Sequence, residues 1–400
     1  MKVYIPDDVK FIIDELEKSK FEAYIVGGCV RDSILGKIPN DWDVTTSALP
    51  SDMKRIFKKT FDTGIEHGTV TVVINKKNYE VTTFRIDGEY EDLRHPKKVE
   101  FSNYLQDDLS RRDFTINAMA YSEKNGLVDL FDGIKDLELR MIRCVNSPKK
   151  RFMEDALRIL RAVRFAVVLN FSLEENTKKY AMDLSETLNY ISKERIREEF
   201  NKIIICDNIN KFDILVETNI LKEIYEPLTK LDFKILKEYF LKLGKNKDLE
   251  LKLALILHKM ENPKEYFSYL KYDNFTRDNV INILFQVENL YKNYEKIDLY
   301  FLRKHLSKYG IFNYEKVLKL LEVIYEIDVL ELYNKYLLIL NNKDPLVIKD
   351  LDIKGNELKE MGIKEGKRIG EILNMLLDEV HKEPEKNSNS VLKNIVRSIL

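Results

Sequence analysis

The amino-acid pattern of the chain changes sharply near residue 150, and this change limits the folds that the sequence can adopt. Before it, short runs rich in β-branched residues alternate with turn residues, at 24–26, 43–46, 68–74, 80–85 and 127–130. Such runs predict the strands of one small sheet. Residues 7–20, with apolar side chains at helical spacing, predict an amphipathic helix ahead of that sheet.

Beyond residue 150 the strand signals nearly vanish, and Leu, Ile, Lys and Glu recur with helical spacing. The segments concerned are 152–169, 174–190, 193–205, 232–243, 248–259, 277–293, 315–341 and 365–380. We therefore expect an α+β chain: an N-terminal mixed-sheet head followed by all-α domains. A length of 400 residues exceeds what one core usually supports. We place the head at 1–145, a helical neck at 146–205, a body at 206–310 and a tail at 311–400.

Three features of the sequence indicate the cellular compartment of the protein. No run of about 18 apolar residues is present, so we expect no membrane span. The N-terminus lacks the apolar segment of a secretory signal. Cys29, Cys144 and Cys206 have no metal-ligand spacing and fit inert thiols in a reducing compartment. These features predict a cytoplasmic protein, and no obligatory protein partner is evident.

The net charge of −1 at first argues against a nucleic-acid partner, but the charges are unevenly distributed. Between Arg140 and Arg164, eight Arg and Lys residues accompany only Glu154 and Asp155. A local cationic stripe of this kind can attract phosphate even in a nearly neutral protein. An ordinary solvated basic helix face would have the same composition, so the stripe needs support from other motifs.

The first motif with chemical content is Asp41-Trp42-Asp43. On a strand, residues i and i+2 project from the same face, so the two carboxylates would point to one place. Mg²⁺ prefers oxygen ligands and usually takes one or two carboxylates, completing its shell with water and phosphate oxygens. Paired ions of this type support in-line phosphoryl transfer. A surface turn produces Asp-X-Asp just as readily, so the pair alone does not establish a metal site.

The run Gly27-Gly28-Cys29-Val30-Arg31-Asp32 just upstream favours the catalytic interpretation. Two glycines permit close approach of backbone to a triphosphate, and Arg31 in the next helical turn can neutralise it. Glu80, on a neighbouring predicted strand, is a candidate third carboxylate for the same site. An ordinary solvent-facing strand residue explains Glu80 equally well.

Two further motifs are rich in arginine. In the run 111–120, Arg-Arg-Asp-Phe-Thr-Ile-Asn-Ala-Met-Ala, Asp113 can cap a following helix, and Arg112 lies at the start of that helix, where it can meet a phosphate. In the run 154–164, Asp155 and Arg158 are three residues apart, hence neighbours on one helix face. A surface salt bridge between them, contributing a few tenths of a kcal/mol, is the plain alternative.

Taken together, these motifs resemble those of the class II tRNA nucleotidyltransferase and poly(A) polymerase family. The runs 27–32 with 41–43, 111–118, 129–133, 154–164 and 193–199 follow in the order that the family has them. The resemblance covers about residues 24–200; beyond them it rests on helical character and on a glycine pattern near 346–385.

The resemblance implies a Mg²⁺-dependent enzyme that acts on the 3′ end of tRNA with CTP and ATP. It implies that Asp41 and Asp43 hold the metal. It implies that Gly28, Arg31 and Arg112 bind the phosphates and ribose of the nucleotide. It also implies that Asp155 and Arg158 face the base, with Arg161 and Arg164 beside them, and that the helical body and tail hold tRNA.

The chemistry of the base fits this assignment. Cytosine and adenine each present an amine donor next to a ring-nitrogen acceptor on the Watson–Crick edge. A carboxylate only accepts hydrogen bonds and a guanidinium only donates them, so Asp155 and Arg158 complement these two bases. Uracil and guanine would face Asp155 with a carbonyl, a mismatch of about 1–3 kcal/mol for each lost polar partner.

Within the family, the resemblance suggests that enzymes adding only CC lack a flexible segment between the metal strands and the Arg-Arg-Asp motif. Residues 87–96 supply such a segment here, so we expect complete CCA addition. An enzyme that adds only the terminal A would keep the same segment. A poly(A) polymerase would be expected to be more basic than a chain of pI 6.6. A non-catalytic RNA-binding protein with a decayed head is disfavoured by the intact acidic and basic motif residues.

Many relatives also carry a His-Asp metal phosphohydrolase site. The nearest sequence here is Leu255-Ile256-Leu257-His258-Lys259, in which a lysine stands where a metal-binding aspartate is needed. We expect no second metal site, and we expect His67 to be structural.

Overall fold

The computed structural model describes residues 3–88, 99–206, 208, 211–364 and 366–399, and they form two compact units. Unit 1 comprises residues 1–233 with 269–271, and unit 2 comprises 234–268 with 272–400. The expected α+β organisation is confirmed: strands are confined to the first 173 residues of the described chain, and helices make up the rest. The four-part division into head, neck, body and tail stays a prediction.

The head is built on a seven-stranded sheet with the order β3-β4-β5-β2-β1-β8-β9. Neighbouring strands are antiparallel except β2 and β5, which are parallel. The strands are β1 (Ala23–Val26), β2 (Val44–Thr46), β3 (Thr60–Gly64), β4 (Thr69–Ile74), β5 (Lys77–Thr83), β8 (Met119–Ser122) and β9 (Gly126–Asp129). Two small ribbons pair β6 (Arg85–Asp87) with β7 (Val99–Phe101) and β10 (Met141–Ile142) with β11 (Ser172–Leu173).

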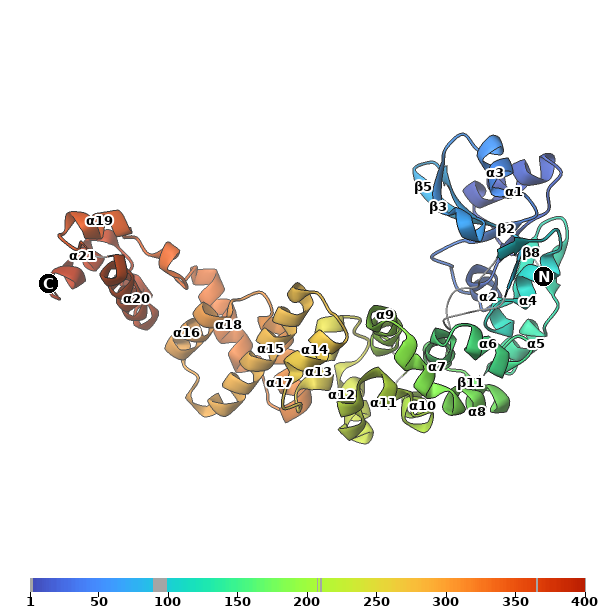
Figure 1. Cartoon of the computed structure of the whole chain (residues 1–400). Coiled ribbons are helices and arrows are strands. Elements are labelled where there is room, and N and C mark those ends of the chain that lie inside the picture. Colours follow the sequence, from blue (N-terminus) through green and yellow to red (C-terminus); the bar gives the residue numbers. More distant parts are fainter. Residues whose placement is uncertain (1–2, 89–98, 207, 209–210, 365, 400) are drawn as a thin grey trace. The chain divides into compact units, whose positions relative to one another are not determined.

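Helices lie on both faces of this sheet, and its strands β1 and β8 are buried at every position (Figure 1). On one face lies the amphipathic helix α1, which begins at Asp7 and buries Val9, Ile12, Ile13 and Leu16. On the other face Leu105 and Leu109 of α4 pack on side chains from β1 and β8. The helices of unit 1 up to the Arg-rich segment are α1 (Asp7–Lys18), α2 (Gly28–Ile34), α3 (Pro50–Ile56), α4 (Leu105–Ser110) and α5 (Gly133–Glu138).

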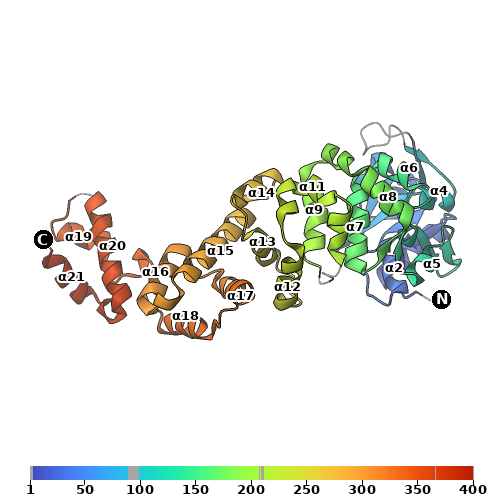
Figure 2. The ribbon, with the colours of Figure 1, turned by 90° about the horizontal axis from the view of Figure 1, so that it is seen from below.

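The Arg-rich segment of unit 1 packs as a layer of helices in which α7 lies beside α9 (Figure 2). Its helices are α6 (Pro148–Glu154), α7 (Leu157–Leu169), α8 (Glu175–Asp183), α9 (Lys193–Ile204), α10 (Asp213–Glu217) and α11 (Ile220–Tyr225). The single helix expected over 152–169 is wrong: the chain leaves helical geometry at Asp155, with φ −142° and ψ 106°, and α7 starts two residues later.

Unit 2 is helical throughout its described residues. Its helices are α12 (Phe233–Leu243), α13 (Leu249–Leu257), α14 (Pro263–Tyr269), α15 (Asn274–Lys292), α16 (Leu299–Tyr309), α17 (Tyr314–Tyr325), α18 (Leu330–Asn342), α19 (Gly355–Glu360), α20 (Gly366–Lys382) and α21 (Asn389–Arg397). The helix expected over 315–341 is split, because Glu326 adopts φ 57° and ends α17. The last three helices share a core of leucine, isoleucine and valine.

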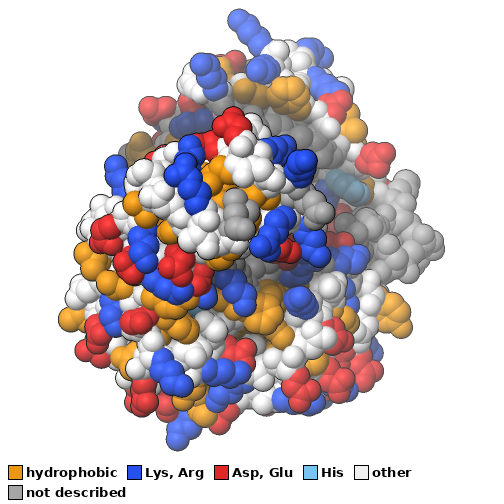
Figure 3. All heavy atoms as spheres, turned by 90° about the vertical axis from the view of Figure 1, so that its left-hand side faces the viewer, with side chains coloured by type: hydrophobic (Ala, Val, Ile, Leu, Met, Phe, Trp, Pro, Cys, Tyr) orange, Lys and Arg blue, Asp and Glu red, His pale blue; other side chains and the backbone are white. Residues whose placement is uncertain are grey.

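Charged side chains of both signs are intermixed among the described residues visible in Figure 3. No helix among the described residues has the length and apolar character needed to cross a membrane. The cysteines are free thiols, and burial raises the pKa of Cys29 to about 11, as expected of an inert thiol.

The turn before α5 depends on a glycine. The Asp129 carboxylate accepts hydrogen bonds from the backbone N–H groups of Gly133 (2.8 Å) and Ile134 (2.9 Å). A Cβ at Gly133 would lie 2.5 Å from the carbonyl oxygen of Thr115 and 2.9 Å from the Met119 side chain. The backbone and a buried side chain therefore leave no room for any residue larger than glycine.

We predict that Gly133→Ala lowers the free energy of unfolding by about 1–3 kcal/mol, because overpacking forces the backbone apart. Urea unfolding followed by circular dichroism measures the change. Gly370→Ala is the control: no atom lies within 4 Å of its Cβ position in α20, so it should stabilise by about 0.5–1 kcal/mol. A Gly133→Ala protein as stable as the parent would contradict this account of the turn.

Candidate active site

Asp41 and Asp43 lie just ahead of β2 rather than on it, since the strand begins at Val44. The chain is nevertheless extended up to Asp43, whose carbonyl oxygen accepts a hydrogen bond from the N–H of Val26 on β1 (3.0 Å). Both carboxylates are solvent-accessible and line one cavity of about 790 Å³. The expectation that the two aspartates open onto one place is thus met, although β2 is shorter than expected.

Glu80 lines the same cavity. The parallel pairing of Val44 with Val81 places Glu80 opposite Asp43, on the same face of the sheet. The electrostatics agree: the pKa of Asp43 is raised by desolvation, and the charges of Glu80 and Asp41 raise it further, whereas Arg112 opposes them. Three carboxylates therefore concentrate negative charge in one cavity, which a cation would relieve.

A divalent metal fits this arrangement. Among the described residues, no three His, Cys, Asp or Glu side chains converge closely enough to form a complete metal cage. An open site of two carboxylates is what Mg²⁺-type ions use when substrate phosphates and water supply the other ligands. Asp41 and Asp43 could hold such an ion, with Glu80 beside them.

The glycine turn directly follows Val26, whose backbone N–H is bonded to the carbonyl oxygen of Asp43. Gly27 adopts φ 82°, and a Cβ there would approach Nη1 of Arg112 to 2.9 Å, so this position requires glycine. Gly28, which we singled out from the sequence, is the first residue of α2 and is less constrained. Arg31 follows in α2, largely buried, and donates hydrogen bonds to Asn117 (2.7 Å) and Asp32 (2.8 Å).

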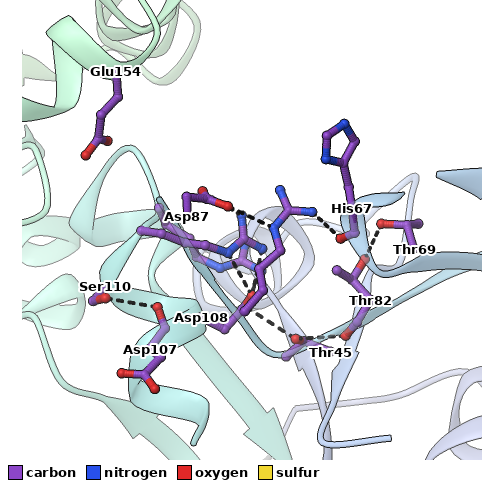
Figure 4. A network of polar contacts seen from close by, with 12 residues as sticks. Thr45, His67, Thr69, Thr82, Asp87, Asp107, Asp108, Ser110 and Glu154 are labelled. Atoms are coloured by element: carbon purple, nitrogen blue, oxygen red, sulfur yellow. Dashed lines mark hydrogen bonds and ion pairs between the residues drawn. The ribbon is translucent and has the colours of Figure 1, made fainter. Parts of the chain in front are cut away.

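Arg112 is held by an aspartate that the sequence analysis passed over. Its Nη2 lies 3.2 Å from Oδ2 of the buried Asp108, and Arg111 binds the other oxygen of that carboxylate (Figure 4). Asp113 is not a helix cap, because a 3₁₀ turn and β8 follow it. Its carboxylate instead accepts two hydrogen bonds from Arg161, at 2.6 and 2.9 Å.

Asp155 and Arg158 do not pair with one another. The break between α6 and α7 turns Asp155 toward Arg195 of α9, with oxygen–nitrogen distances of 3.0 and 3.4 Å. Arg158 donates to Glu154 (2.6 Å) and to the carbonyl oxygen of Arg111 (3.2 Å). The surface salt bridge considered as the plain alternative is therefore absent from the structure.

Arg161 and Arg164, together with Arg31, surround an aromatic ring. The guanidinium carbons of Arg164, Arg31 and Arg161 lie 3.9, 5.1 and 5.5 Å from the centre of the buried Phe165 ring, within cation–π range. Arg164 also pairs with Glu199 of α9 at 2.5 Å. Burial lowers the pKa of Arg164 to about 10, with Glu199 opposing that effect.

Sequence reasoning missed the residues that hold Asp155 and these arginines. Each missed residue is a carboxylate, amide or guanidinium from another element, and they are Asp108, Asn117, Glu154, Arg195 and Glu199. The only sequence signal for most of them was their place inside the same motif runs. His67 contributes its carbonyl oxygen to Arg85, which fits a structural role. Most of the segment 87–96 lies outside the described residues.

Comparisons with known proteins identify the families that two parts of the chain match. Residues 23–143 match the family described as Poly A polymerase head domain, and residues 170–231 match the family described as probable RNA and SrmB-binding site of polymerase A. The fold and the head-domain match identify a nucleotidyltransferase, a class of enzyme that uses a divalent metal.

Similar proteins and structures show to which family of nucleotidyltransferases the chain belongs. A CCA-adding enzyme of Pediococcus pentosaceus is 37% identical over 98% of both chains, and one of Streptococcus suis is 50% identical over 49% of each. A crystal structure of the Bacillus stearothermophilus CCA-adding enzyme in complex with CTP matches 98% of this chain and 97% of that one, with 29% identity and a TM-score of 0.83. The chain belongs to the family of CCA-adding enzymes.

The ion pair of Asp113 predicts how the stability of the folded protein depends on pH. Burial alone would raise the pKa of Asp113, but the charge and hydrogen bonds of Arg161 outweigh burial and lower the pKa to about 2. A carboxylate whose folded pKa lies below the unfolded value of about 3.9 stabilises the protein above about pH 4 and loses that effect as the pH falls toward 2.

We therefore expect Asp113→Asn to cost about 2–3 kcal/mol at neutral pH, with a smaller difference from the parent below about pH 4. Urea unfolding at a series of pH values measures both. Asp132→Asn, at an exposed position with φ 59°, should match the parent throughout. An Asp113→Asn deficit that does not shrink in acid would contradict the ion-pair explanation.

Proposed function

We propose that this chain adds the sequence CCA to the 3′ end of tRNA, using CTP and ATP. The observation that carries the proposal is the cavity in which Asp41, Asp43 and Glu80 gather next to Arg112. The comparisons support it, because the relatives that match nearly the whole chain are CCA-adding enzymes. A cytoplasmic location is part of the proposal, since a cytoplasm holds tRNA and both nucleotides.

In the reaction, the 3′-hydroxyl oxygen of the RNA bonds to the α-phosphorus of the nucleotide, and the bond to the pyrophosphate leaving group breaks. Mg²⁺, held by Asp41 and Asp43, would neutralise the developing charge on the oxygens involved. The chain's own part is positioning. Arg112 and Arg31 bind the phosphates and ribose, and the turn at Gly27 and Gly28 lets the backbone approach them.

Base selection falls to Asp155 and Arg158. In the structure Asp155 is paired with Arg195 and Arg158 with Glu154, so each is held in place by a partner of opposite charge. An incoming cytosine or adenine offers a donor to Asp155 and an acceptor to Arg158, whereas uracil and guanine offer the reverse. Arg161 and Arg164, fixed by Asp113 and Glu199, support the position of α7 beside the base.

The helical segments beyond residue 206 complete the proposal as the part that holds tRNA. Phosphate contacts there should weaken as salt rises. Two alternatives remain as outcomes of the tests: an enzyme that adds only the terminal A, and a non-catalytic RNA-binding protein. The intact carboxylates and arginines of the site favour a catalyst.

We predict that a tRNA transcript lacking its whole CCA end gains two C residues with CTP alone and a terminal A when ATP is also present. Extension of labelled tRNA, resolved on a sequencing gel, measures both. Asp41→Ala combined with Asp43→Ala should abolish incorporation. Addition of A only to a transcript ending in CC, without C addition, would identify an A-adding enzyme. No addition by the parent protein would favour the RNA-binding alternative.

For base selection, we predict that Asp155→Ala and Arg158→Ala each reduce the preference for CTP over UTP by about fivefold to a hundredfold, since a polar partner lost from the base edge is worth about 1–3 kcal/mol. The ratio of kcat/KM for CTP and UTP measures the preference. Lys150→Ala, an exposed position on α6, is a control that should leave the ratio unchanged. Full discrimination in both variants would show that these residues do not select the base.

A further inference from the structure

Asp108 is a fully buried carboxylate at the centre of the polar network beside the cavity (Figure 4). It lies on α4, and four donors converge on its two oxygens. Oδ1 accepts from Nε and Nη2 of Arg111, at 3.0 and 2.6 Å. Oδ2 accepts from Nη2 of Arg112 (3.2 Å) and from the hydroxyl of Thr45 (3.3 Å).

The Thr45 contact ties this carboxylate to the strand that carries the catalytic aspartates. Thr45 stands two residues after Asp43, and its hydroxyl also lies 3.2 Å from the carbonyl oxygen of Thr82 on β5. Asp108 therefore contacts β2 through Thr45, and β2 pairs with β5, the strand that carries Glu80.

One nitrogen of the Arg112 guanidinium is bonded to Asp108, and another lies close to the glycine turn. Nη2 binds Asp108, and Nη1 lies beside Gly27, where a Cβ would come within 2.9 Å of it. Its buried Nε has no hydrogen-bond partner among the described residues. The Arg112 side chain is about 20% exposed, so this guanidinium is oriented by Asp108 while its accessible part can still donate to a ligand.

Asp108 does more than neutralise the charge of Arg111. Arg111 occupies one oxygen of Asp108 and also lies 3.8 Å from Asp87, a second carboxylate. The other oxygen of Asp108 is taken by Arg112 and Thr45. Loss of the Asp108 charge would leave two adjacent guanidiniums to repel one another, and would free Arg112 to turn toward the negative charge of Asp43.

We infer that Asp108 is a positioning residue for nucleotidyl transfer: it holds Arg112 in the orientation that receives the nucleotide's phosphates and keeps it from pairing with the metal-binding carboxylates. The inference rests on the proposed function. It assigns to Asp108 an effect on the reaction that passes through Arg112 and through no other group.

A double-mutant cycle tests this route. The kcat and KM for CTP are measured for the parent, Asp108→Asn, Arg112→Ala and the double variant, on tRNA lacking CCA. We expect Asp108→Asn to lower kcat/KM by about tenfold to a hundredfold, the range caused by small misplacements of a substrate-binding group. Because the effect passes through Arg112, the double variant should be no worse than Arg112→Ala alone.

Asp107→Asn is the matched control: it is the adjacent carboxylate on α4, is bonded to Ser102, and should leave kcat/KM at the parent value. Losses that multiply in the double variant, or an Asp108→Asn protein with parent kcat/KM, would overturn the inference. If circular dichroism shows that Asp108→Asn does not fold, Asp108→Glu carries the same cycle, since it keeps the buried charge but displaces it. An inactive parent protein would instead refute the proposed function.

Discussion

The ion pair between Arg161 and Asp113, in which two guanidinium nitrogens bind one carboxylate oxygen, determines how the Arg-rich helix α7 is attached to the head. Asp113 also accepts a hydrogen bond from Asn117 (3.3 Å), whose side-chain oxygen accepts one from Arg31 (2.7 Å). A continuous series of polar contacts thus connects α2, the helix after the glycine turn, through the Arg-Arg-Asp motif to α7. Loss of Arg161 from this pair is costly, because Asp113 is buried and would be left as an unpaired charge. The groups proposed for phosphate and for base are therefore positioned together.

The arginines of the site are balanced within the protein, which explains how a chain with a net charge of −1 can carry a binding site for triphosphates. Arg112, Arg158, Arg161 and Arg164 each have a carboxylate partner on another turn or element. Such partners hold a guanidinium in one orientation before a ligand arrives, so less ordering is needed on binding. A nucleotide that contacts Arg158 or Asp155 must then compete with Glu154 or Arg195, and only a base with matching donors and acceptors can do so.

Much of this arrangement could be predicted from the sequence. The i, i+2 spacing of Asp41 and Asp43 indicated a shared direction, and the β-branched run at 80–85 placed Glu80 near a strand beside them. The break at Asp155 could not be foreseen, because Leu157 and Ile159 continue the helical spacing of the residues before it. Strand β8 was hidden for a similar reason: its Met119 and Ala120 fit a helix equally well.

Contacts between residues that are far apart in the sequence could not be predicted either. Nothing local to Asp155 indicates Arg195, forty residues later, and nothing near Arg161 indicates Asp113, because these contacts arise only when α7 packs on the head and on α9. Asp108 was passed over since one acidic residue in a charged run carries no pattern. Its role follows from burial and from the convergence of donors upon it.

A crystal structure of the chain with bound CTP would test the account of base selection most directly. The account predicts that Asp155 and Arg158 contact the Watson–Crick edge of the cytosine, with Arg112 on the triphosphate and still bonded to Asp108. A cytosine edge contacted by other residues, with Asp155 still paired to Arg195 and Arg158 to Glu154, would contradict it.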